Sequence, residues 1–315
     1  MQEINYTSSD AKSTIYAYIW RPEAEMEIRG VLQLVHGFAE HALRYSDFAK
    51  FMTRQGYVVC AHDQLGHGRT AGGRFGYIGK NGHKLLAKDT YKLTMLLKKE
   101  FGLSVPIILL GFGAGSLVAR YVCSLWGMEY GGAVFSGTSC GGASVNFLYR
   151  MFSASKLKPS TGEKEAAWVN RRLHSRNGKA FRNSEQGTSW LTRDATQAAA
   201  FEADPLCGFP LTYGASLDLL KLVRITNSRG WPVRMPKNLP IYLFSGLDDP
   251  MGNFGDGVIK VYSELASAGC KDIEIRLYED ARHDMLFEIN KDEVYEDIKN
   301  WLVGAATSHP SQRRV

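Results

Sequence analysis

Short apolar runs alternate with amphipathic stretches along most of the chain. Runs rich in aliphatic and β-branched residues predict strands, and their near-continuous apolar character is typical of strands that helices cover on both faces. The predicted strands span residues 30–35, 57–61, 105–110, 132–135, 241–244 and 273–277. Apolar residues at helical spacing predict helices over residues 83–101, 115–125, 258–268 and 292–302. The pattern therefore predicts an α/β fold with a mostly parallel central sheet flanked by helices.

The alternation breaks between residues 140 and 237. This stretch contains an apolar segment at residues 147–152 and the motif from Trp190 to Asp194, but no convincing strand pattern. It is typical of a helical insertion into an α/β unit. We therefore expect a core made of residues 1–139 and 238–315, and a helical cap made of residues 140–237.

Composition narrows the class of protein. Hydrophobic residues make up 44% and charged residues 22% of the 315 positions, which excludes collagen-like, disordered and disulfide-scaffold proteins. The first ten residues have neither the basic nor the apolar region of a secretory signal. The five cysteines are an odd number without C-x-x-C spacing, which favours reduced thiols over a disulfide frame or a zinc site. These features predict a cytoplasmic protein.

The positive charge is concentrated in one segment. The formal net charge is +6, and eight basic residues between positions 156 and 182 face only Glu163 and Glu165. These basic residues are Lys156, Lys158, Lys164, Arg171, Arg172, Arg176, Lys179 and Arg182. The rest of the chain is about neutral, which argues against a nucleic-acid partner. The cluster is either a solvated helix face or a site of transient contact with an anionic substrate or lipid surface.

A glycine-dense turn lies between the strand at residues 105–110 and the next helix. Gly111, Gly113 and Gly115 are compatible with a dinucleotide-binding turn, but Ser116 stands where that motif needs its last small residue, and no carboxylate follows the next strand. The turn also fits the nucleophile elbow G-x-S-x-G at both outer glycines, with Gly113 at the serine position. A turn without chemistry is the third interpretation.

Three other loops decide between these interpretations. A His-Gly turn at His36 follows the first predicted strand, and its backbone amides are suited to an oxyanion. Asp248 and Asp249 follow the strand at residues 241–244, and His283 follows the strand at residues 273–277. Elbow, acid and histidine thus occur in the chain order of α/β hydrolases.

From about residue 30 to residue 303 the sequence resembles the monoacylglycerol lipase and lysophospholipase branch of the α/β-hydrolase superfamily, which includes the S33-type serine aminopeptidases. Four segments carry the resemblance: H-G-x-x-E-H-x-x-R-Y, D-x-x-G-H-G-x-S with Thr70 at its last position here, G-x-x-D and the histidine loop. They correspond to residues 36–45, 63–70, 246–249 and 279–283.

The resemblance implies a role for each site residue. Asp249 is the triad acid and His283 the base, while the amides of Phe38 and Ala114 form the oxyanion hole; Asp248 has no such role. The implied substrate is a lipid-like or other small acyl ester, and no metal or organic cofactor is implied. The family has serine at the centre of the elbow, where this chain has Gly113.

Glycine at the elbow changes the expected chemistry. Gly113 has no side-chain oxygen, so no acyl-enzyme can form there. Ser116 is one helical turn further on, and Cys140 follows the next strand, so both are poor substitutes. We expect a carboxylic ester hydrolase scaffold with impaired catalysis, in which His283 could still activate a water molecule. The alternative is a non-catalytic protein of the same fold that binds an acyl or other apolar ligand, and dinucleotide binding is the third hypothesis.

Overall fold

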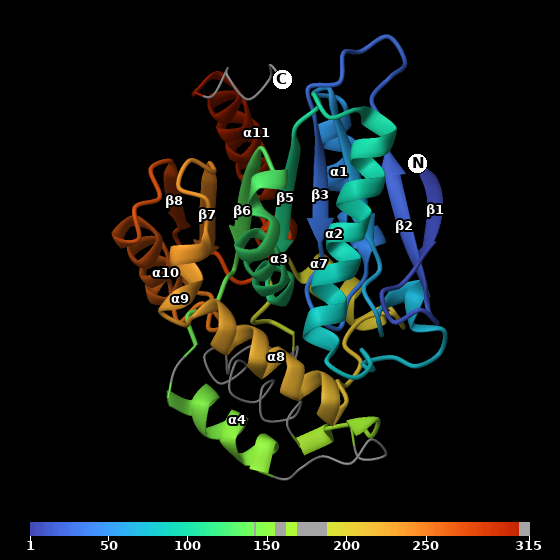
Figure 1. Cartoon of the computed structure of the whole chain (residues 1–315), viewed down its shortest axis with the longest axis vertical. Coiled ribbons are helices and arrows are strands. Elements are labelled where there is room, and N and C mark those ends of the chain that lie inside the picture. Colours follow the sequence, from blue (N-terminus) through green and yellow to red (C-terminus); the bar gives the residue numbers. More distant parts are fainter. Residues whose placement is uncertain (142, 155–161, 169–187, 309–315) are drawn as a thin grey trace.

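The computed structural model describes the whole chain except residues 142, 155–161, 169–187 and 309–315. Its centre is an eight-stranded sheet with the order β1-β2-β4-β3-β5-β6-β7-β8 (Figure 1). The strands are β1 Gln2–Thr7, β2 Thr14–Trp20, β3 Gly30–Val35, β4 Tyr57–His62, β5 Ile107–Phe112, β6 Gly132–Ser136, β7 Ile241–Gly246 and β8 Ile273–Tyr278. Strands β3 to β8 pair in parallel, whereas β1 and β2 add an antiparallel edge. The predicted, mostly parallel sheet is confirmed.

Helices cover both faces of this sheet. The helices of the core are α1 Ser46–Thr53, α2 Gly82–Phe101, α3 Ala114–Trp126, α10 Asp256–Ser267 and α11 Lys291–Ser308. One apolar cluster joins the sheet to α2, α3 and α10, and a second joins its other face to α1 and α11. Side chains of successive strand residues therefore enter two separate cores, which explains why the strands are apolar at nearly every position.

The two N-terminal strands were not predicted. In β2, an unbroken apolar run from Ile15 to Trp20 follows the exposed Thr14, and Ile15, Ala17 and Ile19 are fully buried. Strand β5 begins two residues later than predicted, at Ile107, because Pro106 has no amide hydrogen for a ladder bond. The carbonyl of Pro106 still accepts a hydrogen bond from Val31 at 2.9 Å.

Between β6 and β7 the described residues include several helices joined by turns and irregular segments. These helices are α4 Ala143–Ala154, α7 Ala195–Ala203, α8 Tyr213–Thr226 and α9 Gly230–Arg234. Figure 1 shows α4 and α8 beyond the lower end of the sheet, and α8 packs on α2 and α3. Apart from Lys164, the basic residues of the 156–182 cluster lie outside the described residues. No helix in the described part of the chain is long and apolar enough to cross a membrane.

Candidate active site

Gly113 forms a sharp turn between β5 and α3. Its φ of +52° and ψ of −121° lie in a region that residues with a side chain enter only under strain. A Cβ atom on Gly115 would lie 2.2 Å from the carbonyl oxygen of Val35, and one on Gly111 would lie 2.6 Å from that of Gly115. Close backbone contacts therefore require the two outer glycines, whereas glycine at position 113 avoids the backbone strain that a side chain there would carry.

Asp249 and His283 lie together although 34 positions separate them. Asp249 is fully buried in the loop after β7, and its Oδ2 atom accepts a hydrogen bond from His283 Nδ1 at 2.9 Å. Ser245 Oγ donates to the same oxygen at 3.1 Å, and the Met251 amide donates to Oδ1 at 2.8 Å. The carboxylate is thus fixed from three sides. The neighbouring Asp248 has no hydrogen bond to His283 among the described contacts.

The free nitrogen of His283 faces Gly113. A Cβ atom built on Gly113 would lie 2.8 Å from Nε2, so a side chain at position 113 requires a small shift of the imidazole ring. Burial disfavours the imidazolium, but the negative charge and hydrogen bond of Asp249 outweigh it and raise the pKa of His283 to about 9. The pair is a base whose proton-accepting atom points at the turn.

The motif beginning at Trp190 supports the histidine loop. The Asp284 amide donates to the Leu191 carbonyl at 2.7 Å, and the Arg282 guanidinium donates to the Ser189 carbonyl at 2.5 Å. The Trp190 ring packs against the imidazole of His283, with 5.3 Å between ring centroids. The sequence analysis singled out this motif but gave it no role; the structure shows that it packs on both sides of the histidine.

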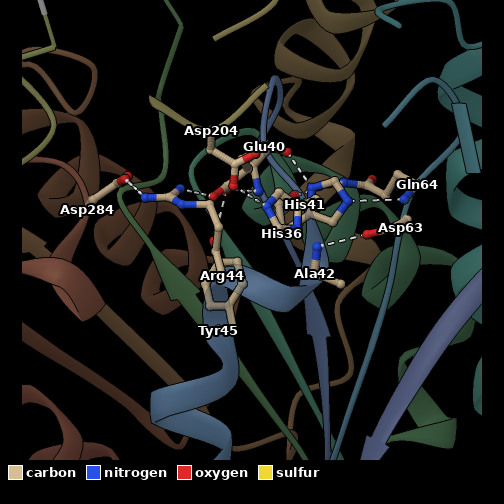
Figure 2. A network of polar contacts seen from close by, with 11 residues as sticks. His36, Glu40, His41, Ala42, Arg44, Tyr45, Asp63, Gln64, Asp204 and Asp284 are labelled. Atoms are coloured by element: carbon tan, nitrogen blue, oxygen red, sulfur yellow. Dashed lines mark hydrogen bonds and ion pairs between the residues drawn. The ribbon is translucent and has the colours of Figure 1, made fainter. Parts of the chain in front are cut away.

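Glu40 holds the His-Gly turn from inside. Its buried carboxylate accepts hydrogen bonds from the Gly37 amide, the Arg44 guanidinium and the Tyr45 hydroxyl, the last at 2.9 Å (Figure 2). Burial opposes ionisation, but the charge of Arg44 holds the pKa of Glu40 below its usual value. An ionised Glu40 therefore fixes the backbone next to Phe38.

Arg44 extends this network to the histidine loop. Its guanidinium donates a hydrogen bond at 3.2 Å to Oδ2 of Asp284, the residue that follows His283 in the chain (Figure 2). Burial raises the pKa of Asp284 and the charge of Arg44 opposes that effect. The ring of Phe287 lies against the same guanidinium, 4.2 Å from its central carbon. The turn at Gly37 and the loop of His283 are thus joined through one cation.

The D-x-x-G-H-G motif has a structural task in the same region. Asp63 accepts hydrogen bonds from the amides of Ala42 and Arg69, both at 2.9 Å. A Cβ atom on Gly68 would lie 2.3 Å from the Asp63 carboxyl carbon, which explains the glycine there. Burial lowers the pKa of His36 to about 4, so the neutral ring accepts a hydrogen bond from the Gln64 amide at 3.0 Å. These contacts tie the turn at residues 36–42 to the end of β4.

A cavity of about 150 Å³ brings the predicted site residues together. Its walls include Phe38, Gly113, Ala114 and His283. Neither the Phe38 nor the Ala114 amide donates a hydrogen bond to another described residue. Apolar side chains form most of the remaining wall, among them Phe112, Trp190, Leu191, Phe201, Phe209, Leu219 and Phe287. The cavity therefore combines an apolar wall, a base and two available amides.

The two alternative nucleophiles point elsewhere. Ser116 is fully buried in α3, and its Oγ atom donates to the Gly113 carbonyl at 2.5 Å. Cys140 is half-buried, and its thiol lies 3.4 Å from the carbonyl oxygen of Gly141. Neither residue is among those described as lining the cavity. Ser245 and Met251, which hold Asp249, were not identified from the sequence, because nothing in a serine or a backbone amide marks it in advance.

The comparisons with known proteins agree with this geometry. The family described as serine aminopeptidase, S33 matches residues 26–290. The monoacylglycerol lipase of Mycolicibacterium smegmatis is 25% identical over 292 residues, covering 90% of this chain and 91% of that protein. The monoglyceride lipase of Rattus norvegicus is 23% identical over 294 residues, covering 91% and 86%.

Solved structures show the same fold. A thermostable carboxyl esterase from Bacillus coagulans superposes with a TM-score of 0.90 at 26% identity, covering 96% of this chain and 98% of that one. A soluble variant of the monoglyceride lipase from Saccharomyces cerevisiae superposes with a TM-score of 0.71 at 19% identity, covering 96% and 94%. The α/β-hydrolase fold expected from the sequence is confirmed. The chain belongs to the serine aminopeptidase S33 family, in its monoacylglycerol lipase-like branch.

Proposed function

We propose that this chain is a carboxylic ester hydrolase scaffold for lipid-like or other acyl esters, with a triad that lacks its nucleophile. One observation carries the proposal: the base His283, held by Asp249 at 2.9 Å, directs its free nitrogen at Gly113 inside an apolar cavity. A buried acid–base pair aimed at an elbow has a use in acyl transfer and none in passive packing. The lipase and esterase names of the relatives support the same class of substrate.

Each group has a proposed role in the complete reaction. A serine at position 113 would attack the ester carbonyl while His283 Nε2 takes its proton, and the Phe38 and Ala114 amides would bind the developing oxyanion. His283 would then return the proton to the leaving alcohol. With Gly113 in place the covalent step is missing, and the same pair can only activate a water molecule for direct attack. We therefore propose that hydrolysis by this chain is slow.

We also propose that residues 140–237 form a cap over this cavity. Leu191, Phe201, Phe209 and Leu219 come from this stretch and line the cavity beside Gly113. A volume of about 150 Å³ suits a group of roughly benzene size, so short acyl chains are the probes best matched to the site. Transient contact of the 156–182 cluster with an anionic lipid surface stays a prediction.

The test is to supply the missing oxygen. We expect Gly113→Ser to raise the turnover of short p-nitrophenyl esters by about 10³-fold or more, because it completes the triad. Gly113→Ala is the matched control, since it adds the same Cβ atom at the same positive φ without a hydroxyl. Fluorophosphonate probes should label only the serine variant, because they report a nucleophilic hydroxyl.

Two outcomes would contradict the proposal. Equal, negligible rates for the serine and alanine variants with short and long acyl esters would mean that the pair is not poised for acyl transfer. A co-purifying lipid in native mass spectrometry, combined with no turnover by the serine variant, would instead support the non-catalytic binding protein.

A further inference from the structure

A group of three metal-ligand side chains lies outside the catalytic pair. His41, Asp204 and Cys207 each offer one ligand atom, and these atoms lie within 4.8 Å of one another; among the described residues no other such group of three or more His, Cys, Asp and Glu occurs. None of the three is assigned a role in ester hydrolysis. We propose that His41, Asp204 and Cys207 form a binding site for one divalent metal ion of the zinc type.

The donor set is suited to such an ion. Imidazole nitrogen, carboxylate oxygen and thiolate sulfur are the three ligand types that Zn²⁺ uses in proteins. Ca²⁺ and Mg²⁺ do not fit a site with a thiol, because their protein ligands are almost always oxygen atoms. In tetrahedral coordination with bonds of about 2.0 to 2.3 Å, ligand atoms lie about 3.3 to 3.8 Å apart, so closure from 4.8 Å needs shifts of about an ångström.

The backbone holds these three side chains in place. Asp204 follows α7, and the Cys207 amide donates to the Asp204 carbonyl at 3.0 Å, which folds residues 204–207 into a tight turn. The Leu206 amide donates to Asp204 Oδ1 at 2.8 Å and orients that carboxylate. The Gly208 amide donates to the Ala39 carbonyl at 2.9 Å and joins this turn to the loop of His41.

The side chains meet where solvent can reach them. His41 Nε2 lies 2.8 Å from Asp204 Oδ2 (Figure 2). The His41 side chain is 9% exposed and that of Asp204 is 30% exposed, so an ion can enter from the Asp204 side and keep a water as its fourth ligand. Binding releases the proton of the Cys207 thiol to solvent and moves the proton of His41 Nε2 to solvent or to Nδ1. Two metal bonds then replace the hydrogen bond between His41 and Asp204.

Sequence spacing could not reveal this site. His41 is 163 positions from Asp204, and no second cysteine lies near Cys207 in the sequence. A search for C-x-x-C spacing cannot detect ligands that come together only through folding. The site would link the loop carrying Phe38 to the turn at residues 204–208, because Ala39 and Gly208 both line the cavity. A bound ion would therefore stiffen one wall of the ester-binding cavity. The inference does not depend on the proposed ester hydrolysis.

The experiment is a titration of the untagged full-length chain with Co²⁺, followed by displacement with Zn²⁺. A cobalt–thiolate bond gives a charge-transfer absorption that oxygen and nitrogen ligands do not give. We expect this band to saturate at one equivalent of Co²⁺ and to vanish when Zn²⁺ is added. Cys140→Ser is the matched control, because Cys140 is the other partly exposed cysteine, and it should leave the band unchanged.

Two variants make the outcome decisive. Cys207→Ser should abolish the band. Asp204→Asn should weaken Co²⁺ binding by more than about 100-fold, which exceeds the loss expected for a residue that only hydrogen-bonds to a metal ligand. Absence of the band in the natural chain, or its survival in Cys207→Ser, would overturn the proposal. If Cys207→Ser does not fold, an unchanged titration curve for Asp204→Asn, whose carboxylate is partly exposed, would overturn it equally.

Discussion

Two buried histidine–aspartate pairs in this molecule share the same kind of hydrogen bond but differ in the other groups that contact them. His283 Nδ1 lies 2.9 Å from Asp249 at the end of the sheet. His83 Nδ1 lies 2.6 Å from Asp218, where α2 meets α8. Both aspartates are almost completely buried, and each accepts a hydrogen bond from a backbone amide.

The difference lies beyond the shared hydrogen bond. His83 stacks beside Tyr121, and Lys221 donates to Asp218 at 3.0 Å, so a lysine ammonium compensates the charge of that carboxylate. Burial opposes ionisation there, but His83 and Lys221 hold the pKa of Asp218 below its usual value. Among the described residues, the further side-chain donor to Asp249 is the neutral hydroxyl of Ser245. The charge of Asp249 raises the pKa of His283.

A short histidine–aspartate distance therefore does not identify a catalytic pair. The proposed catalytic role of His283 rests on its second nitrogen, Nε2, which faces Gly113 at the wall of the cavity. The pair at His83 connects a helix that covers the sheet with a helix from the 140–237 stretch, and neither of its residues is described as lining that cavity. This contrast supports the proposed role of Asp249 and His283 in acyl transfer, whereas His83 and Asp218 join two helices.

The largest expected effect comes from removing one charge from each pair in the Gly113→Ser background. Asp249→Asn should lower kcat for a short p-nitrophenyl ester by about 10³- to 10⁴-fold, because the amide no longer holds the imidazole in the productive tautomer. Asp218→Asn should leave kcat within about twofold and lower the free energy of unfolding by about 1 to 3 kcal/mol. Rate assays and urea unfolding of both variants measure the contrast. Similar losses of kcat in the two would remove the distinction between the pairs.

The next effect is a dependence on pH. With a pKa of about 9, His283 is mostly imidazolium at neutral pH and cannot accept a proton until the pH rises. For Gly113→Ser, kcat/KM should therefore increase about tenfold per pH unit below pH 9 and level off above it, a total of about 100-fold from pH 7. Asp218→Asn should show the same profile, because that carboxylate does not contact His283. A plateau already reached at pH 7 would contradict the role of Asp249 in holding the proton.

The sequence predicted one of these pairs and not the other, for a physical reason. Asp249 and His283 follow successive parallel strands, and the carboxyl ends of such strands meet at one edge of the sheet, so proximity could be inferred without coordinates. His83 and Asp218 meet through the packing of two helices 135 positions apart, and no strand order fixes how helices approach. Ser245 was missed for another reason: it stands in β7 four residues before Asp249, and nothing in a lone serine marks it as a hydrogen-bond donor to that carboxylate. Strand β1 was missed because it is a partly exposed edge strand with a weak apolar pattern. Strand β2 lies between β1 and β4, and its apolar run from Ile15 to Trp20 was not recognised as a strand.

The smallest expected effect concerns the third donor on Asp249. Ser245 is completely buried, and its hydroxyl donates a hydrogen bond at 3.1 Å to Asp249 Oδ2, the oxygen that also accepts from His283. Ser245→Ala in the Gly113→Ser background removes this donor and leaves the carboxylate less well oriented, so kcat should fall about 3- to 10-fold with little change in KM. The freed lone pair also makes Asp249 a stronger partner for the imidazolium, so the midpoint of the pH profile should move upward.

Lys221→Met is the matched change in the other pair, because it removes the side-chain donor that Asp218 has besides His83. It should leave both kcat and the pH midpoint unaltered, since Lys221 reaches only the pair that joins the helices. If Ser245→Ala lowers kcat without any movement of the midpoint, the serine acts through packing alone. A shift confined to Ser245→Ala would show that the charge of Asp249, through its partners, sets the basicity of His283.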